Sequence, residues 1–76
     1  MTPSRLLGQR ERLQQLIETL DALPENYRRA IILAKIEGLT TQELAEQLGK
    51  PREAAALVLH RALRSFREKQ DTERSS

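Results

Sequence analysis

Residues 39–49 read LTTQELAEQLG, and residues 52–61 read REAAALVLHR. The spacing of the apolar residues predicts a short helix in the first segment, a turn at Gly49 and a basic helix in the second. Ala45 precedes Gly49 by four residues, where two steeply crossing helices need a small side chain so that their backbones can approach. Apolar contacts between the two helices are expected from Leu44, Leu48, Ala55 and Leu59. This layout is that of a helix-turn-helix, a motif that reads DNA with its second helix.

The composition bounds the size and class of the fold. The chain has 76 residues, no cysteine, and one residue each of His, Tyr and Phe. A core of this size is marginal, and without cysteine neither a disulfide nor a thiolate metal site can stabilise it. A single histidine makes no zinc site, so we expect no metal and no cofactor. Because no alternating β-branched run is present, we predict an all-α fold, a small four-helix domain with a C-terminal helix-turn-helix.

Start and stop signals divide the chain into four predicted helices. The first covers about residues 9–22 and is ended by Pro24. The second covers about residues 25–37 and is closed by Gly38. This second helix is apolar on several sides, so we expect it to be the central one.

The third and fourth helices form the predicted helix-turn-helix. Thr40 is expected to cap the third helix, with Glu43 completing a capping box, and Gly49 to stop it. The fourth helix starts at Pro51 and is expected to run to about Lys69.

Residues 9–69 make up the predicted domain. A flexible N-terminal or linker segment is expected at residues 1–8, and a flexible polar tail at residues 70–76. Since residues 1–8 lack a long apolar run, neither a secretory signal nor a membrane span is expected. The protein is therefore predicted to be soluble and cytoplasmic.

The positive charge is concentrated near the C-terminus. Residues 1–48 carry a net charge of −1, residues 49–70 carry +4 and residues 71–76 carry −1. The cations of the middle segment are Lys50, Arg52, Arg61, Arg64, Arg67 and Lys69. Two interpretations stay open, a surface that approaches phosphates and a solvated helix whose cations favour the negative end of its dipole.

The fourth helix separates into two faces at about 100° per residue. The side chains expected to face the core are Ala55, Leu59, Ala62, Leu63 and Phe66. Those expected on the opposite face are Ala54, Leu57, Arg61, Arg64 and Glu68, with Glu53 and His60 at its edge. In a helix-turn-helix this outward face enters the major groove.

The outward face offers several groups for DNA. Arg61 and Arg64 can donate to guanine or to phosphate oxygens, and Glu53 can accept from a cytosine amino group. His60 can donate, accept or stack on a base. Its alternative interpretation is a solvated histidine on an exposed face.

Several motifs in order resemble one known family. They are LPENYRRAIIL at residues 23–33, EGLT at 37–40, ELA at 43–45, LG at 48–49 and LHRA at 59–62. Together they resemble conserved region four of bacterial sigma factors, most closely the extracytoplasmic-function group. The resemblance implies a domain that binds core RNA polymerase and reads the minus-thirty-five element of double-stranded promoter DNA through its last helix.

The resemblance also implies residue roles. Thr41 and Gln42 would meet the DNA backbone, while Ala56, Leu57, His60 and Arg61 would lie at the bases. With the charged candidates, the predicted DNA-binding set is Thr41, Gln42, Lys50, Arg52, Glu53, Ala56, Leu57, His60, Arg61 and Arg64. Since few residues precede Leu23 and none of them resembles region two, we expect a domain excised from a longer sigma factor rather than a complete small protein.

The chain departs from the family where base-reading donors are usual. It has Ala56, Leu57 and Val58 at these positions. An outward Leu57 can contact a thymine methyl group, or it can belong to a protein interface.

Two classes of function therefore stay open. One is a promoter-reading module, and the other is a sigma-like interaction module that binds an anti-sigma factor, a polymerase subunit or itself. An enzyme is not expected, because the sequence has no nucleophile with a base at hand and no Gly-rich phosphate loop.

Overall fold

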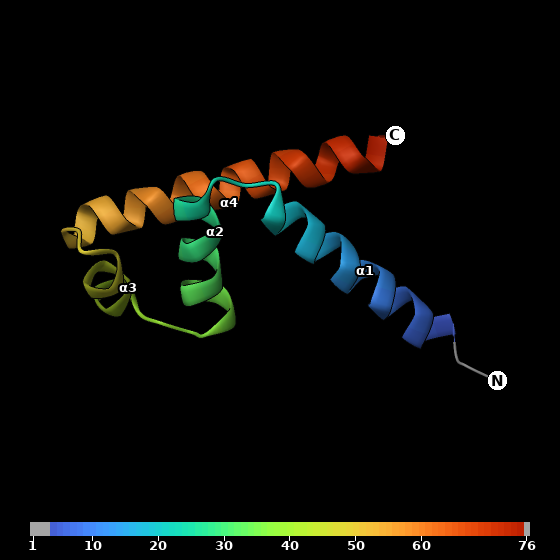
Figure 1. Cartoon of the computed structure of the whole chain (residues 1–76), viewed down its shortest axis with the longest axis horizontal. Coiled ribbons are helices and arrows are strands. Elements are labelled where there is room, and N and C mark those ends of the chain that lie inside the picture. The colour runs from blue at the N-terminus through green and yellow to red at the C-terminus, as the bar shows by residue number, and fades with distance from the viewer. Residues whose placement is uncertain (1–3, 76) are drawn as a thin grey trace.

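The structure, a computed structural model, describes residues 4–75, with side chains from residues 10–71. Its elements are α1 (Ser4–Asp21), α2 (Glu25–Ile31), the π-helical turn η1 (Ile32–Ile36), α3 (Thr41–Leu48) and α4 (Arg52–Ser75). Because η1 continues α2 without a break, the elements amount to four helices (Figure 1). The predicted all-α, four-helix class is confirmed.

The long helix α4 supports the other three. Figure 1 shows α2 and α3 lying against the first half of α4. The C-terminal end of α1 lies beside α2, and α1 diverges from α4 toward the N-terminus (Figure 1). The molecule is elongated and flat, with extents of 49 × 26 × 14 Å. The second helix, which was expected to be central, packs against α4 through α2 and against α3 through η1. The helix that contacts α1, α2 and α3 is α4.

The core consists of two clusters. The first, called here the α1-side cluster, joins α1, α2 and α4 through the buried residues Leu20, Leu23, Ile31 and Ala62. The second, called here the motif cluster, joins α2, α3 and α4 through Ala30, Leu44, Ala45 and Ala55. Three of its four members are alanines, so the helix backbones can approach one another closely around Leu44. The predicted contacts of the helix-turn-helix are confirmed, since Leu48 and Leu59 pack against this cluster.

Both ends of α3 have the predicted turn chemistry. The Thr40 hydroxyl accepts from the Glu43 N–H at 3.2 Å, and the Thr40 N–H donates to a Glu43 carboxylate oxygen at 3.0 Å. This is the expected capping box. At the other end Gly49 has a φ of 65°, a left-handed conformation that suits glycine. The Lys50 N–H then donates to the Ala45 carbonyl at 3.0 Å, which closes the turn.

Two helices are longer than predicted. The first begins at Ser4 rather than residue 9, and the fourth ends at Ser75 rather than near Lys69. Neither extension contains proline. Gly8 lies within the first extension and lowers its helix propensity without ending the helix, and the second extension is polar and compatible with a helix. The flexibility of residues 1–8 and 70–76 stays a prediction, and residues 1–3 and 76 lie outside the described residues.

The end of the second helix also differs from the regular α-helix that was expected. The Glu37 N–H donates to the Ile32 carbonyl at 2.9 Å, which is a π-type bond across five residues. Ile31 belongs to the α1-side cluster and Ile32 packs against it, whereas Leu33 and Ala34 pack against the motif cluster. A wider turn rotates the chain less per residue, so successive apolar side chains can serve both clusters. Gly38, with a φ of 75°, ends the helix as predicted.

We expect Leu44→Ala to lower the free energy of unfolding by about 3 kcal/mol, because it opens a cavity among the alanines of the motif cluster. Leu57→Ala is the matched control, since the same change at a side chain that is 47% exposed should cost less than about 0.5 kcal/mol. Urea unfolding followed by circular dichroism measures both. Equal losses in the two variants would contradict the assignment of the core.

The capping box makes a pH-dependent contribution. The pKa of Glu43 is held below its usual value by the hydrogen bond from the Thr40 backbone and then by the one from the Thr40 side chain. The stabilisation is complete above the unfolded-state pKa and is lost as pH falls through the lower folded-state pKa. Glu43→Gln should therefore lower the melting temperature most at neutral pH, and the difference from the unchanged protein should shrink in acid. Glu46→Gln, on the same helix but outside the capping box, is the control. If the loss of melting temperature in Glu43→Gln does not depend on pH, the prediction is refuted.

Candidate nucleic-acid interface

One face of α4 is exposed to solvent and carries most of the predicted DNA-binding residues. This face, called here the outer stripe, consists of exposed residues at intervals of three and four: Glu53, Ala56, Leu57, His60, Arg61 and Arg64. Such spacing places side chains in one row along a helix. The structure therefore brings these six residues together on one surface.

The opposite face of α4 is the buried one, as predicted. Ala55 and Ala62 are fully buried, while Leu59, Leu63 and Phe66 are partly buried and pack against the clusters. One assignment was wrong, because Ala54 is half-buried rather than outward. Ala54 lies one turn before Val58, which packs against the motif cluster, and so it occupies the flank of the buried face.

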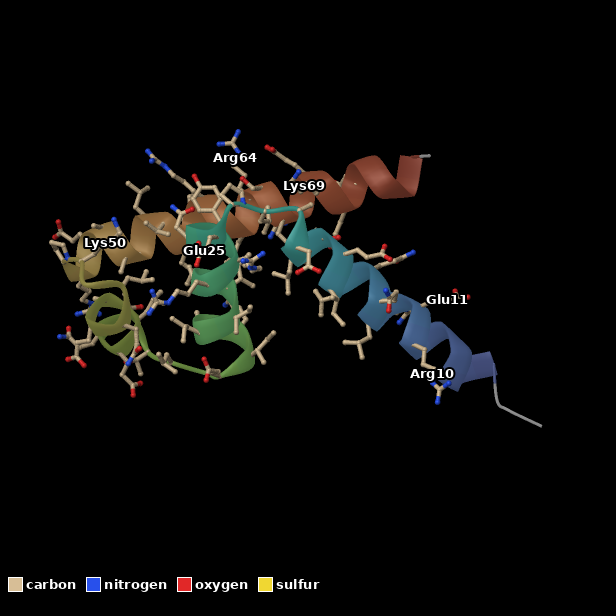
Figure 2. All side chains as sticks on the ribbon, viewed as in Figure 1. Arg10, Glu11, Glu25, Lys50, Arg64 and Lys69 are labelled. Carbon is tan, nitrogen blue, oxygen red and sulfur yellow. The ribbon has the colours of Figure 1, made fainter. Side chains whose placement is uncertain are left out.

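Arg64 projects from the outer side of α4, away from α2 and α3 (Figure 2). Its Nε lies 3.4 Å from an Oε1 of Glu68, and both side chains are largely exposed. An exposed ion pair of this kind contributes at most about 1 kcal/mol. A phosphate can therefore replace Glu68 as the partner of Arg64 at little cost. A shallow groove follows the same side of α4, lined by His60, Leu63, Arg64, Arg67, Glu68 and Asp71.

The remaining predicted residues lie around the turn and at the start of α3. Lys50, labelled in Figure 2, is exposed where the turn leads into α4, and Arg52 is the exposed first residue of α4. Thr41 and Gln42 stand in the first turn of α3, with Thr41 half-buried and Gln42 exposed. These four residues thus flank the helix-turn-helix and do not belong to the outer stripe.

Arg29 is a positioning residue that the sequence did not reveal. Its Nη2 donates to the Gln47 carbonyl at 3.1 Å, which joins α2 to the last turn of α3. A cation at this end of a helix also interacts favourably with the helix dipole. The contact spans 18 residues, so no local pattern predicts it. It helps to fix the turn that leads into α4.

Exposed apolar side chains mark a second surface. Leu13 is 56% exposed, Ile17 is 45% exposed and Ile36 is 62% exposed. Leu16 of α1, the residue before Ile17, packs against the α1-side cluster. Ile32 of η1, four residues before Ile36, also packs against it. The exposed residues Leu13 and Ile17 of α1 and Ile36 of η1 are together called here the apolar surface. In Figure 1, α1 and η1 lie apart from the first turns of α4.

Within residues 4–75, no helix is both long and apolar enough to cross a membrane. Among residues 10–71, whose side chains the structure describes, the four exposed large apolar side chains are the three of the apolar surface and Leu57 of the outer stripe.

Comparison with known proteins agrees with this geometry. The model of the family described as Sigma-70, region 4 matches residues 13–66, which is well over half of the chain. No curated protein and no solved structure matches. The matched residues contain the motif cluster, the turn at Gly49 and the outer stripe. The family is not one of enzymes, in agreement with the sequence. The chain belongs to the Sigma-70, region 4 family, whose helix-turn-helix domains bind DNA in transcription initiation.

Proposed function

We propose that this domain reads the minus-thirty-five promoter element with the outer stripe of α4 and binds core RNA polymerase through a separate surface. The observation that carries the proposal is the exposed row from Glu53 to Arg64, which lies opposite the fully buried Ala55 and Ala62. A helix held by one face and free on the other has the form needed to enter a major groove.

The charges of this region suggest a division of roles. Arg61 and Arg64 are long, exposed donors in the second half of the outer stripe, suited to guanine or phosphate. Lys50 and Arg52 stand at the entrance to α4 and are suited to phosphates. The exposed Gln42 and the half-buried Thr41, in the first turn of α3, are suited to the DNA backbone on the other side of the turn.

The extracytoplasmic-function group is the subtype that we propose. The support is the motif order from LPENYR at residues 23–28 through EGLT at 37–40 to LHRA at 59–62. In the structure these motifs correspond to the start of α2, the loop before α3 and the middle of α4.

The apolar surface of Leu13, Ile17 and Ile36 is the proposed polymerase-binding surface. These three large apolar side chains are 45–62% exposed, which makes them candidates for a protein contact. Since α1 diverges from α4, a partner on α1 would leave the outer stripe free for DNA (Figure 1). Both ligands can then bind at once, as promoter recognition requires.

A second candidate function is a sigma-like interaction module with weak or no DNA binding. The observation in its favour is Leu57, which is exposed where a hydrogen-bonding residue was expected. In this case the outer stripe would bind an anti-sigma factor, a polymerase subunit or a second copy of the chain.

The first test is salt-dependent binding to duplex DNA. The Arg61→Ala/Arg64→Ala variant should bind at least about tenfold more weakly at low salt, with a salt slope reduced by about one for each arginine that contacts a phosphate. Fluorescence anisotropy with labelled duplexes at several salt concentrations measures both quantities.

The matched control for this test removes the same charge from the far end of the molecule. Arg10 and Arg12 are exposed on α1, and Figure 2 shows Arg10 remote from α4. Arg10→Ala/Arg12→Ala should therefore leave binding nearly unchanged. The proposal fails if the unchanged protein binds no duplex at low salt, or if the control variant loses as much affinity as the test variant.

The second test separates the two surfaces. Ile17→Asp should abolish co-elution with core RNA polymerase in size-exclusion chromatography without DNA, because it places a charge in the apolar surface. Leu57→Asp should leave that complex intact. The reverse pattern would favour the interaction module at Leu57, and thermal melts confirm that both exposed substitutions leave the fold intact.

A further inference from the structure

The middle of the outer stripe combines three different chemistries. Leu57 is 47% exposed, with Glu53 one turn before it and Arg61 one turn after it. Four residues advance a helix by about 6 Å, so the three side chains follow one another at that interval. A carboxylate, an apolar group and a guanidinium are thus presented in succession along one face.

The surroundings of Leu57 are suited to a small apolar contact. It is the one exposed large apolar side chain on the part of α4 whose side chains the structure describes. Its neighbours in the outer stripe are charged, polar or as small as Ala56. A protein-binding patch usually extends over at least a few hundred Å², which one leucine among charges does not provide. The site therefore fits a single methyl-sized group better than a protein partner.

Base chemistry then limits what Leu57 can face in a major groove. Leucine neither donates nor accepts a hydrogen bond. Placed against the acceptors of guanine, the amino group of cytosine or the polar edge of adenine, it would remove water without replacing its hydrogen bonds. The thymine methyl is the one apolar group that a base offers there.

We propose that Leu57 is a specificity-determining residue that reads the C5-methyl group of a thymine in the promoter element. This inference rests on the proposed DNA-reading function and deepens it, since it names the base at the centre of the outer stripe. Glu53 favours a base with an amino group on one side of that thymine, and Arg61 favours guanine on the other.

The test begins with a selection: duplexes that bind the domain together with core RNA polymerase are recovered from a pool of randomised sequences. In a recovered duplex each thymine is replaced in turn by deoxyuridine, which lacks only the methyl group. Anisotropy should show one position where the replacement weakens binding about fourfold, the effect of losing one buried methyl-sized group.

Leu57→Ala is the matched protein variant, since it shortens the contact without adding a charge. In this variant the replacement at that position should have little effect. The unchanged protein should bind a duplex with 5-methylcytosine at that position more tightly than one with cytosine, because 5-methylcytosine restores the methyl group.

The outcomes separate this inference from the proposed function. Salt-dependent duplex binding with no methyl-sensitive thymine, or with a sensitivity that Leu57→Ala retains, overturns the role of Leu57 and leaves the DNA-reading function standing. The absence of salt-dependent binding to any duplex overturns both.

Discussion

The close approach of three helices around Leu44 is the constraint on which the rest of the structure depends. Leu44 is fully buried, and the alanines Ala30, Ala45 and Ala55 surround it from three different elements. A domain of this size has few other buried side chains to stabilise it. The small residues at the contacts let the helix backbones come close together, so that dispersion and burial stabilise the packing. A larger side chain at any of these alanines would separate the helices and reorient α4.

The outer stripe does not take part in this packing. The buried face of α4 is fixed by both clusters, whereas no member of the outer stripe belongs to either. Changes in the stripe, for example at Ala56 or Leu57, can therefore alter what it contacts without disturbing the fold. Family membership accordingly predicts the scaffold better than it predicts the bases that the scaffold reads.

The parts predicted from the sequence are those with local causes. The capping box of Thr40 and Glu43, the turn at Gly49 and the buried face of α4 each follow from residues within a turn or two of one another. The bond from Arg29 to Gln47 and the π turn of η1 were missed, because they arise from how distant segments pack. The ends of α1 and α4 were missed for a different reason. Gly8 lies inside α1 without ending it, and no proline or glycine lies near the C-terminal end of α4. The DNA-binding roles remain predictions, because geometry alone does not identify a ligand.

The distribution of charge explains why the proposed function needs two surfaces. The whole chain carries only +2. In the first turns of α4 the cation Arg52 is offset by the acid Glu53, and Leu57 is apolar. The stripe arginines lie farther along the helix, so phosphate attraction is modest where the bases would be read. Binding of the apolar surface to polymerase would raise the effective concentration of the domain at the promoter. Weak, selective contacts from α4 would then suffice, because the polymerase supplies the affinity that a small domain of low net charge lacks.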